Sequence, residues 1–160
     1  MRAALAVGPI EEGTMEATQN SQPVVRLKIK ELGPAECLAR LRETQVARIG
    51  VSVDALPSIL PVFVTVLDQS VAFRTVPGTK LWAATNGAIV AVEADAFDHA
   101  TGEGWSVVVR GRATQITSPQ RIARVRQSHM WSWIGAGAAE HFVEVGLDLV
   151  TGRSIRPSED

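Results

Sequence analysis

The 160-residue sequence contains no tyrosine and a single cysteine, Cys37. The first absence excludes tyrosine as an acid, a base or a stacking partner, and the second excludes an intrachain disulfide. A lone cysteine is typical of a reducing compartment, so we expect a cytoplasmic protein. The formal net charge is −1, whereas proteins that bind nucleic acid or an anionic membrane carry an excess of basic residues. We therefore expect neither partner.

Long apolar runs are also missing. No stretch approaches the roughly 20 apolar residues of a membrane-spanning helix. The apolar run over residues 3–7 is too short for the core of a signal peptide, and the residues up to about 22 mix small, acidic and amide side chains. We therefore expect a disordered leader over residues 1–23, in which Met15 is an alternative start, and one ordered domain over residues 24–157.

Alternating apolar residues predict a mainly β protein. Six segments have this character: 46–53, 58–67, 71–75, 88–94, 104–117 and 141–150. Helical patterns are short and fall at 34–44, 78–85 and 120–128, and the stretches 95–103 and 131–140 are predicted loops. The absence of a regular strand–helix alternation argues against a Rossmann fold. The pattern instead predicts a six-stranded antiparallel β-barrel with short helical covers.

The segment from Phe73 to Lys80 is the strongest candidate for a binding site. It is predicted to contain the end of a strand, a tight turn and the start of a helix, and it carries two cations and two hydroxyls: Arg74, Lys80, Thr75 and Thr79. Backbone N–H groups at a helix start, with Arg and Lys beside them, suit a phosphate group. A solvated strand end with an ordinary threonine cap and a surface lysine is the alternative interpretation.

A second candidate is the head of the strand that begins at Gly104. Trp105 has an aromatic face that suits a flat ring, and Ser106 offers a hydroxyl for a ring heteroatom or a phosphate. A tryptophan buried in the core is the alternative. The three histidines are scattered without the spacing of metal ligands, so we predict no metal site. Trp131 and Trp133 are predicted to form a flap over a pocket, a dimer contact or a cap on the barrel.

These segments, in this order, resemble the pyridoxamine 5′-phosphate oxidase-like family and its small actinobacterial flavin-binding branch. The resemblance rests on Arg74-Thr75-x-x-Gly78-Thr79-Lys80-Leu81, on Gly104-Trp105-Ser106-Val107 with the following Val109-Arg110-Gly111-Arg112-Ala113, and on Gly152-Arg153. It covers about residues 31–157. It implies a split β-barrel of the FMN-binding type that forms a homodimer, with the cofactor at the subunit interface.

The resemblance also implies which residues contact the cofactor. Arg74 and Lys80 would hold the FMN phosphate, while the backbone around Val62 would face the flavin ring and Trp105 would reach the same flavin from its own or the partner subunit. The full predicted set is Pro61, Val62, Phe63, Arg74, Thr75, Thr79, Lys80, Trp105 and Ser106.

One departure from the family narrows the function. The C-terminal Arg-x-His motif of true pyridoxamine phosphate oxidases has no counterpart in Gly152-Arg153-Ser154-Ile155-Arg156-Pro157, which argues against vitamin B6 oxidation. The leading hypothesis is an FMN-dependent oxidoreductase that acts on a small organic substrate, with no catalytic side chain assigned. The alternatives are an F420-dependent oxidoreductase, for which Arg48 and Arg112 would offer further positive charge, a non-catalytic flavin or F420 carrier or sensor, and a structural dimeric barrel with a decayed site.

Overall fold

The computed structural model describes residues 26–128 and 140–158. It contains eight strands: β1 (Leu27–Glu31), β2 (Val46–Val53), β3 (Leu56–Leu67), β4 (Ser70–Thr75), β5 (Ile89–Asp98), β6 (Glu103–Gln115), β7 (His141–Gly146) and β8 (Leu149–Pro157). Three helices accompany them: α1 (Pro34–Glu43), α2 (Thr79–Thr85) and α3 (Pro119–Gln127). The leader predicted over residues 1–23 and the predicted flap with Trp131 and Trp133 lie outside the described residues.

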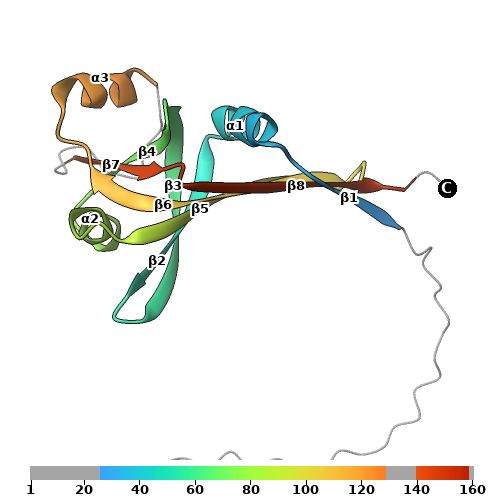
Figure 1. Cartoon of the computed structure of the whole chain (residues 1–160), viewed down its shortest axis with the longest axis horizontal. Helices are drawn as coiled ribbons and strands as arrows, with labels where there is room; N and C mark the ends of the chain where they lie inside the picture. The colour runs from blue at the N-terminus through green and yellow to red at the C-terminus, as the bar shows by residue number, and fades with distance from the viewer. Residues whose placement is uncertain (1–25, 129–139, 159–160) are drawn as a thin grey trace, which may run out of the picture.

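Six of the strands close into an antiparallel barrel, as the sequence predicts. Their order is β6-β5-β2-β3-β4-β7, and β7 returns to pair with the C-terminal end of β6 (Figure 1). Because side chains alternate along each strand, one face of every barrel strand points into the core. The core therefore contains a residue such as Ile49, Phe73, Val92, Val109 or Val143 from nearly every strand.

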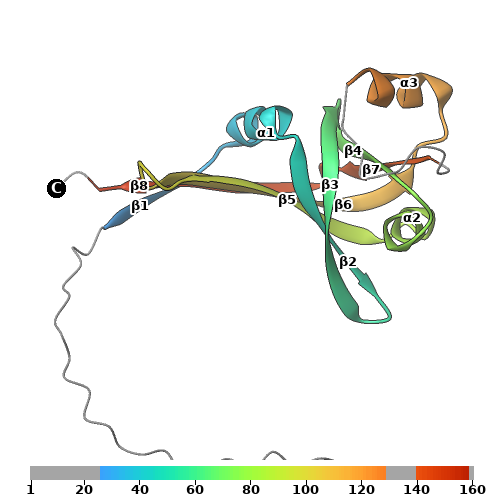
Figure 2. The same cartoon turned by 180° about the vertical axis from the view of Figure 1, so that it is seen from behind.

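The remaining strands extend the sheet beyond the barrel. β6 is 13 residues long, and its N-terminal part pairs with β8 from Gly104 to Arg110, whereas its C-terminal part pairs with β7. β1 pairs with the outer edge of β8. We call the extension formed by β1, β8, residues 95–98 and residues 103–107 the arm. Figures 1 and 2 show the arm projecting from the barrel, with α1 on one side of it.

Two sequence predictions are wrong in this region. The predicted loop over 95–103 is mostly strand, because β5 runs to Asp98 and pairs residue by residue with β6 as far as Glu103. The single strand predicted over 141–150 is two strands, β7 and β8, separated at residues 147–148. β1 was not predicted, and all five of its residues are exposed. Backbone pairing with β8, and not burial, holds β1.

Helix α1 covers the junction between the arm and the barrel. Its buried residues are Cys37 and Leu41, and its first turn is capped because the Gly33 N–H donates to Glu36 Oε2 at 2.8 Å. The helix approaches β8 closely at Gly152, where a Cβ atom would lie 2.7 Å from Cys37 Sγ. Burial raises the pKa of the Cys37 thiol. Only a residue without a side chain fits opposite this helix.

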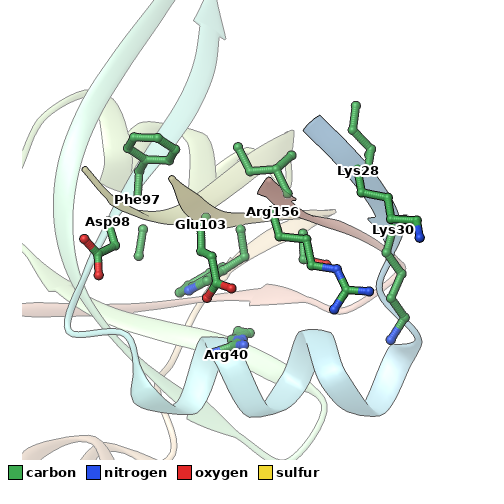
Figure 3. A pocket seen from close by; sticks show the side chains of 13 residues that line it. Lys28, Lys30, Arg40, Phe97, Asp98, Glu103 and Arg156 are labelled. Atoms are coloured by element: carbon green, nitrogen blue, oxygen red, sulfur yellow. The ribbon is translucent and has the colours of Figure 1, made fainter. Parts of the chain in front are cut away.

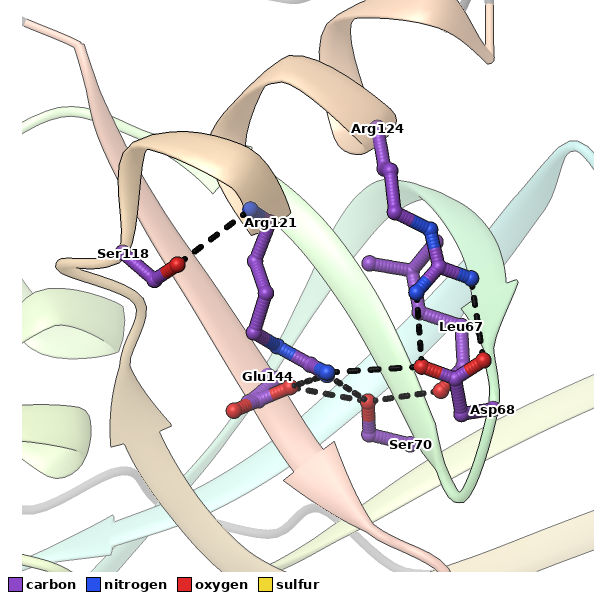
Figure 4. Close-up of polar contacts among 7 residues, drawn as sticks. All are labelled: Leu67, Asp68, Ser70, Ser118, Arg121, Arg124 and Glu144. Atoms are coloured by element: carbon purple, nitrogen blue, oxygen red, sulfur yellow. Dashed lines mark hydrogen bonds and ion pairs between the residues drawn. The ribbon is translucent and has the colours of Figure 1, made fainter.

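Helix α3 is held to the β3–β4 turn and to β7 by a cluster of charged residues (Figure 4). Arg124 donates to both carboxylate oxygens of Asp68, at 2.7 and 2.9 Å. Arg121 pairs with Glu144 and donates to Ser70 Oγ at 3.3 Å. The hydrogen bonds from Arg124 lower the pKa of Asp68. The cluster ties α3 to the barrel beside a small apolar contact around Val125.

Candidate functional site

Strands β3 and β4 diverge at one end of the barrel, and two of the predicted site segments lie where they separate. Their pairing ends at Val64 and Phe73. Beyond this pair β3 runs along β2, with Pro61 opposite Arg48, whereas β4 runs along β7, with Thr75 opposite His141. Residues 61–63 and 74–75 are therefore the first residues on either side of the split, although they are more than ten positions apart in the sequence.

Within residues 61–63 the side chains point in two directions. Val62 is 2% exposed and belongs to the barrel core. Pro61 is exposed and Phe63 half-buried, and both lie on the opposite, outer face of β3. Any ligand on the outside of the barrel can touch Val62 only through its backbone, which is the contact that the family resemblance implies.

Lys80 lies in the first turn of α2, which packs against β2, β6 and β7. The helix begins after Gly78, whose φ of 151° is one that residues with a side chain rarely adopt, and Trp82 N–H donates to Gly78 O at 2.9 Å. The Lys80 side chain is half-buried, and burial lowers its pKa. Over residues 26–128 and 140–158 no carboxylate lies within ion-pair distance of it. A partly desolvated cation without a counter-charge is favourable for anion binding.

Arg74 is near the same junction and belongs to a charged group. Its Nη1 donates to Glu140 Oε1 at 2.8 Å, and Arg126 Nη2 lies 3.3 Å from Oε2 of the same carboxylate. Two guanidinium groups thus share the carboxylate of Glu140. Thr75 is buried, and its hydroxyl donates to Val76 O at 3.1 Å. The hydroxyl proton is therefore used within the turn. Thr79 is the first residue of α2.

Trp105 and Ser106 are not part of this cluster within one chain. Both lie in the arm, where Trp105 is opposite Ala96 and Ser154. Near α2, β6 is joined to the chain after that helix by the hydrogen bond from Ala113 N–H to Ala88 O. Ala113 is eight positions after Trp105 along the strand, which corresponds to roughly 25 Å. The side chains of Trp105 and Ser106 also lie on opposite faces of β6, and Arg40 of α1 stacks over the Trp105 ring at 5.5 Å from its centroid.

The arm and α1 together present a set of charged residues that the sequence did not indicate. Lys28, Arg40, Glu103 and Arg156 surround Trp105 in one groove. The alternation of lysine with apolar residues in Leu27-Lys28-Ile29-Lys30 is the signal that would have identified β1 as a strand. The position of Lys28 opposite Arg156 in the β1–β8 pair has no signal in the sequence.

In the part of the chain that the structure describes, no group of three or more His, Cys, Asp or Glu residues is arranged to hold a metal ion. No described helix combines the length and the apolar character that crossing a membrane requires.

A closed antiparallel barrel of six strands, two of which separate at one end, defines the split-barrel class. The model of the pyridoxamine 5′-phosphate oxidase family matches residues 33–154, and the chain belongs to this family. This confirms the resemblance identified from Arg74 to Leu81 and from Gly104 to Ala113.

Individual relatives agree with this assignment. The uncharacterized protein Rv0080 of Mycobacterium tuberculosis is 32% identical over 86% of this chain and 93% of its own length. The structure of the FAD binding protein from Mycobacterium smegmatis is 32% identical, with a TM-score of 0.66 over 79% of this chain and 97% of that one. A FAD-binding protein from Mesorhizobium loti, at 23% identity and a TM-score of 0.69 over 84% and 100% of the two chains, shares the fold.

Proposed function

We propose that this protein is a flavin-dependent oxidoreductase that binds FMN at the split between β3 and β4. The observation that carries the proposal is Lys80, a half-buried cation at this end of the barrel with no carboxylate partner among the described residues. A phosphate supplies the missing negative charge. Membership of the pyridoxamine 5′-phosphate oxidase family and the FAD-binding relative in Mycobacterium smegmatis support a flavin as the molecule that bears this phosphate.

The proposed roles follow from the geometry of the split. Lys80 and Arg74 hold the phosphate, and Thr79 contributes its hydroxyl and backbone N–H at the start of α2. Thr75 keeps the turn in place through its bond to Val76 O. The outer edge of β3 at residues 61–63 faces the ring system. When bound, the flavin supplies the hydride or electron transfer, and the protein supplies its position and its electrostatic surroundings.

We further propose that the active form is a homodimer. Large apolar side chains remain exposed on the sheet face opposite α1: Ile29 (65%), Ile59 (73%), Ile89 (63%) and Phe97 (48%). Large apolar side chains that are exposed on one face are typical of an interaction site. Ser106 lies on the same face, so a second copy seated there brings it toward a flavin that the arm of its own chain does not reach.

Titration of FMN into cofactor-stripped protein tests the flavin site. We expect saturable quenching of flavin fluorescence at one flavin per chain. Lys80→Ala should weaken binding about tenfold or more, because one charge-assisted hydrogen bond contributes roughly 1.5–3 kcal/mol. Lys30→Ala is the matched control, since Lys30 is an exposed lysine whose partner is Glu36 in the arm. Equal affinities for all three proteins remove Lys80 from the site.

The same preparation separates the alternatives. A protein that binds F420 and not FMN is an F420-dependent oxidoreductase or carrier. A protein that binds FMN but is reduced by neither NADH nor NADPH, and that oxidises no reduced F420, is a carrier or sensor. Reduction of the bound flavin, followed by its reoxidation with an organic acceptor, supports the oxidoreductase.

A further inference from the structure

A groove of about 890 Å³ lies at the outer end of the arm, away from α2. Arg40 of α1 lines one side of it, and Ile29 and Phe97 of the opposite sheet face also line it. Figure 3 shows Glu103 and Arg156 pointing from the arm toward α1, whereas Phe97 points to the other side. Trp105, Ala96 and Ser154 line the floor of the groove. Its volume is in the range of roughly 300–1,000 Å³ that small-molecule sites occupy.

The charges in this groove are arranged in a way that the sheet alone does not favour. Lys28 lies directly opposite Arg156 in the β1–β8 pair, and Asp98 lies directly opposite Glu103 in the β5–β6 pair. Like charges directly opposite each other destabilise a sheet. Exchanging one member of each pair would give two ion pairs at the same four positions. The observed arrangement instead separates a basic half of the groove from an acidic half.

Most of these charged groups have no ion-pair partner among the residues that the structure describes. Lys30 pairs with Glu36 at 2.9 Å, and Asp98 accepts a 2.8 Å hydrogen bond from the backbone N–H of Ala100. Among the described residues, Lys28, Arg40 and Arg156 have no carboxylate within ion-pair distance, and the Glu103 carboxylate accepts no hydrogen bond. Three cations and one carboxylate are therefore available around the exposed edge of Trp105.

We propose that this groove binds a nucleoside diphosphate. Lys28 and Arg156 form a pair of adjacent cations suited to the two phosphates. The Arg40 guanidinium already lies over the Trp105 ring, so its outer face offers the planar surface to the base, and guanidinium groups stack on such rings. Glu103 is an acceptor for ribose hydroxyls. An inorganic anion would use the cations alone and leave the aromatic floor and the carboxylate unoccupied.

The groove is distinct from the proposed flavin phosphate site, because Trp105 and Lys80 lie near opposite ends of β6. A nucleoside diphosphate can reach it in two ways. It can bind as a free nucleotide, which is independent of the proposed function. It can also be the tail of a dinucleotide flavin, which rests on the proposed function.

Calorimetric titration of the full-length protein with ADP tests the groove. We expect one ADP per chain, bound more tightly than either adenosine or pyrophosphate. Arg156→Gln should weaken ADP binding about tenfold or more, whereas Arg42→Gln, which removes an exposed arginine of α1 outside the groove, should leave it unchanged. Trp105→Leu should lower the affinity for ADP toward that for pyrophosphate and leave pyrophosphate binding unaffected.

Parallel titrations with FMN and FAD identify the source of the nucleotide. If the groove takes the tail of a dinucleotide, FAD binds more tightly than FMN, Arg156→Gln abolishes the difference, and ADP competes with FAD. If it takes a free nucleotide, the two flavins bind alike and ADP binds to the FMN-loaded protein. Absence of ADP binding with equal flavin affinities overturns the groove site, as does ADP binding that Arg156→Gln leaves intact. Failure of FMN to bind overturns only the flavin site.

Discussion

At the scale of single residues, partial burial distinguishes Lys80 from the other lysines. Lys30 is exposed and pairs with Glu36, and Lys28 is exposed at the edge of the arm. Lys80 is half-buried, and no ion pair within residues 26–128 and 140–158 replaces the hydration that it loses. The chemistry of the proposed site therefore depends more on this residue than on Arg74, whose charge is shared with Glu140.

The pH dependence of cofactor binding should follow Lys80. Burial lowers its pKa from the ordinary value of 10.5. The protonated form attracts the phosphate, so FMN affinity should be highest below this lowered pKa and fall as the pH rises through it. Lys80→Arg keeps its charge at alkaline pH and should flatten the profile. Flavin titrations between neutral and alkaline pH measure this, and a profile that Lys80→Arg leaves unchanged assigns the pH dependence to another group.

A second prediction at this scale concerns Gly152. Gly152→Ala places a Cβ atom 2.7 Å from Cys37 Sγ, so we expect a loss of about 1–3 kcal/mol in the free energy of unfolding. Cys37→Ala makes room for the added methyl group. The two substitutions together should therefore cost less than the sum of their separate effects in urea denaturation. If the two changes in the free energy of unfolding are strictly additive, the contact between Cys37 and Gly152 is not what restricts the side chain at position 152.

At the scale of elements, β6 determines the architecture, because it leaves β8 and joins β7 within a few residues. Gly111 lies at this transition, between the last pair with β8 at Arg110 and the first pair with β7 at Ala113. A Cβ atom there would lie 1.9 Å from Gly146 O, a backbone atom that cannot rotate away. Barrel closure thus requires the close approach of two backbones.

Gly111→Ala should prevent normal barrel closure and greatly reduce soluble, cooperatively folding protein. Gly33→Ala is the matched control, because its Cβ atom meets nothing nearer than Glu36 Oε2 at 3.6 Å, and it should change the free energy of unfolding by less than about 1 kcal/mol. Thermal and urea denaturation of both variants provide the comparison. A stable, native-like Gly111→Ala protein would contradict the observed approach of β6 to β7.

The docking of α3 should weaken in acid. Hydrogen bonds from Arg124 lower the pKa of Asp68 in the folded protein, so the carboxylate binds protons more readily in the unfolded chain. Its stabilising contribution is complete above the unfolded pKa of about 3.9 and is lost as the pH falls through the lower folded value. Asp68→Asn should reduce the acid dependence of hydrogen-exchange protection in α3. Equal acid dependence in both proteins would exclude Asp68 as its cause.

At the scale of the whole molecule, the two ends of the barrel are chemically different. The split and α2 lie at one end, and the arm with its charged groove lies at the other. The face opposite α1 exposes apolar side chains in both parts of the molecule, Ile29 and Phe97 in the arm and Ile59 and Ile89 in the barrel. A second copy on that surface would place residues of the arm near the split of its partner, which is why dimerisation and cofactor binding are coupled in our proposal.

Ile59→Glu should therefore shift a dimer toward monomer and weaken FMN binding with it. Leu56→Glu is the matched control. Leu56 is 72% exposed at the β2–β3 turn, and its side chain is on the other face of β3 from that of Ile59. Light scattering gives the mass, and we expect twice the chain mass for the wild type and for the control. If the wild-type protein is a monomer and still binds FMN, the proposed dimer is wrong and the proposed flavin site stands.

The sequence by itself determined the barrel, the family and the segment around Lys80. Barrel strands have one buried face, so their side chains alternate in polarity, and the turn and helix start from Val76 to Thr79 are local features. Only the tertiary structure decided the extent of the arm, the division of residues 141–157 into β7 and β8, and the separation of Trp105 from Lys80. β1 is exposed throughout and held by backbone hydrogen bonds that any sequence can make, and which strands pair across the chain depends on contacts that no local pattern records.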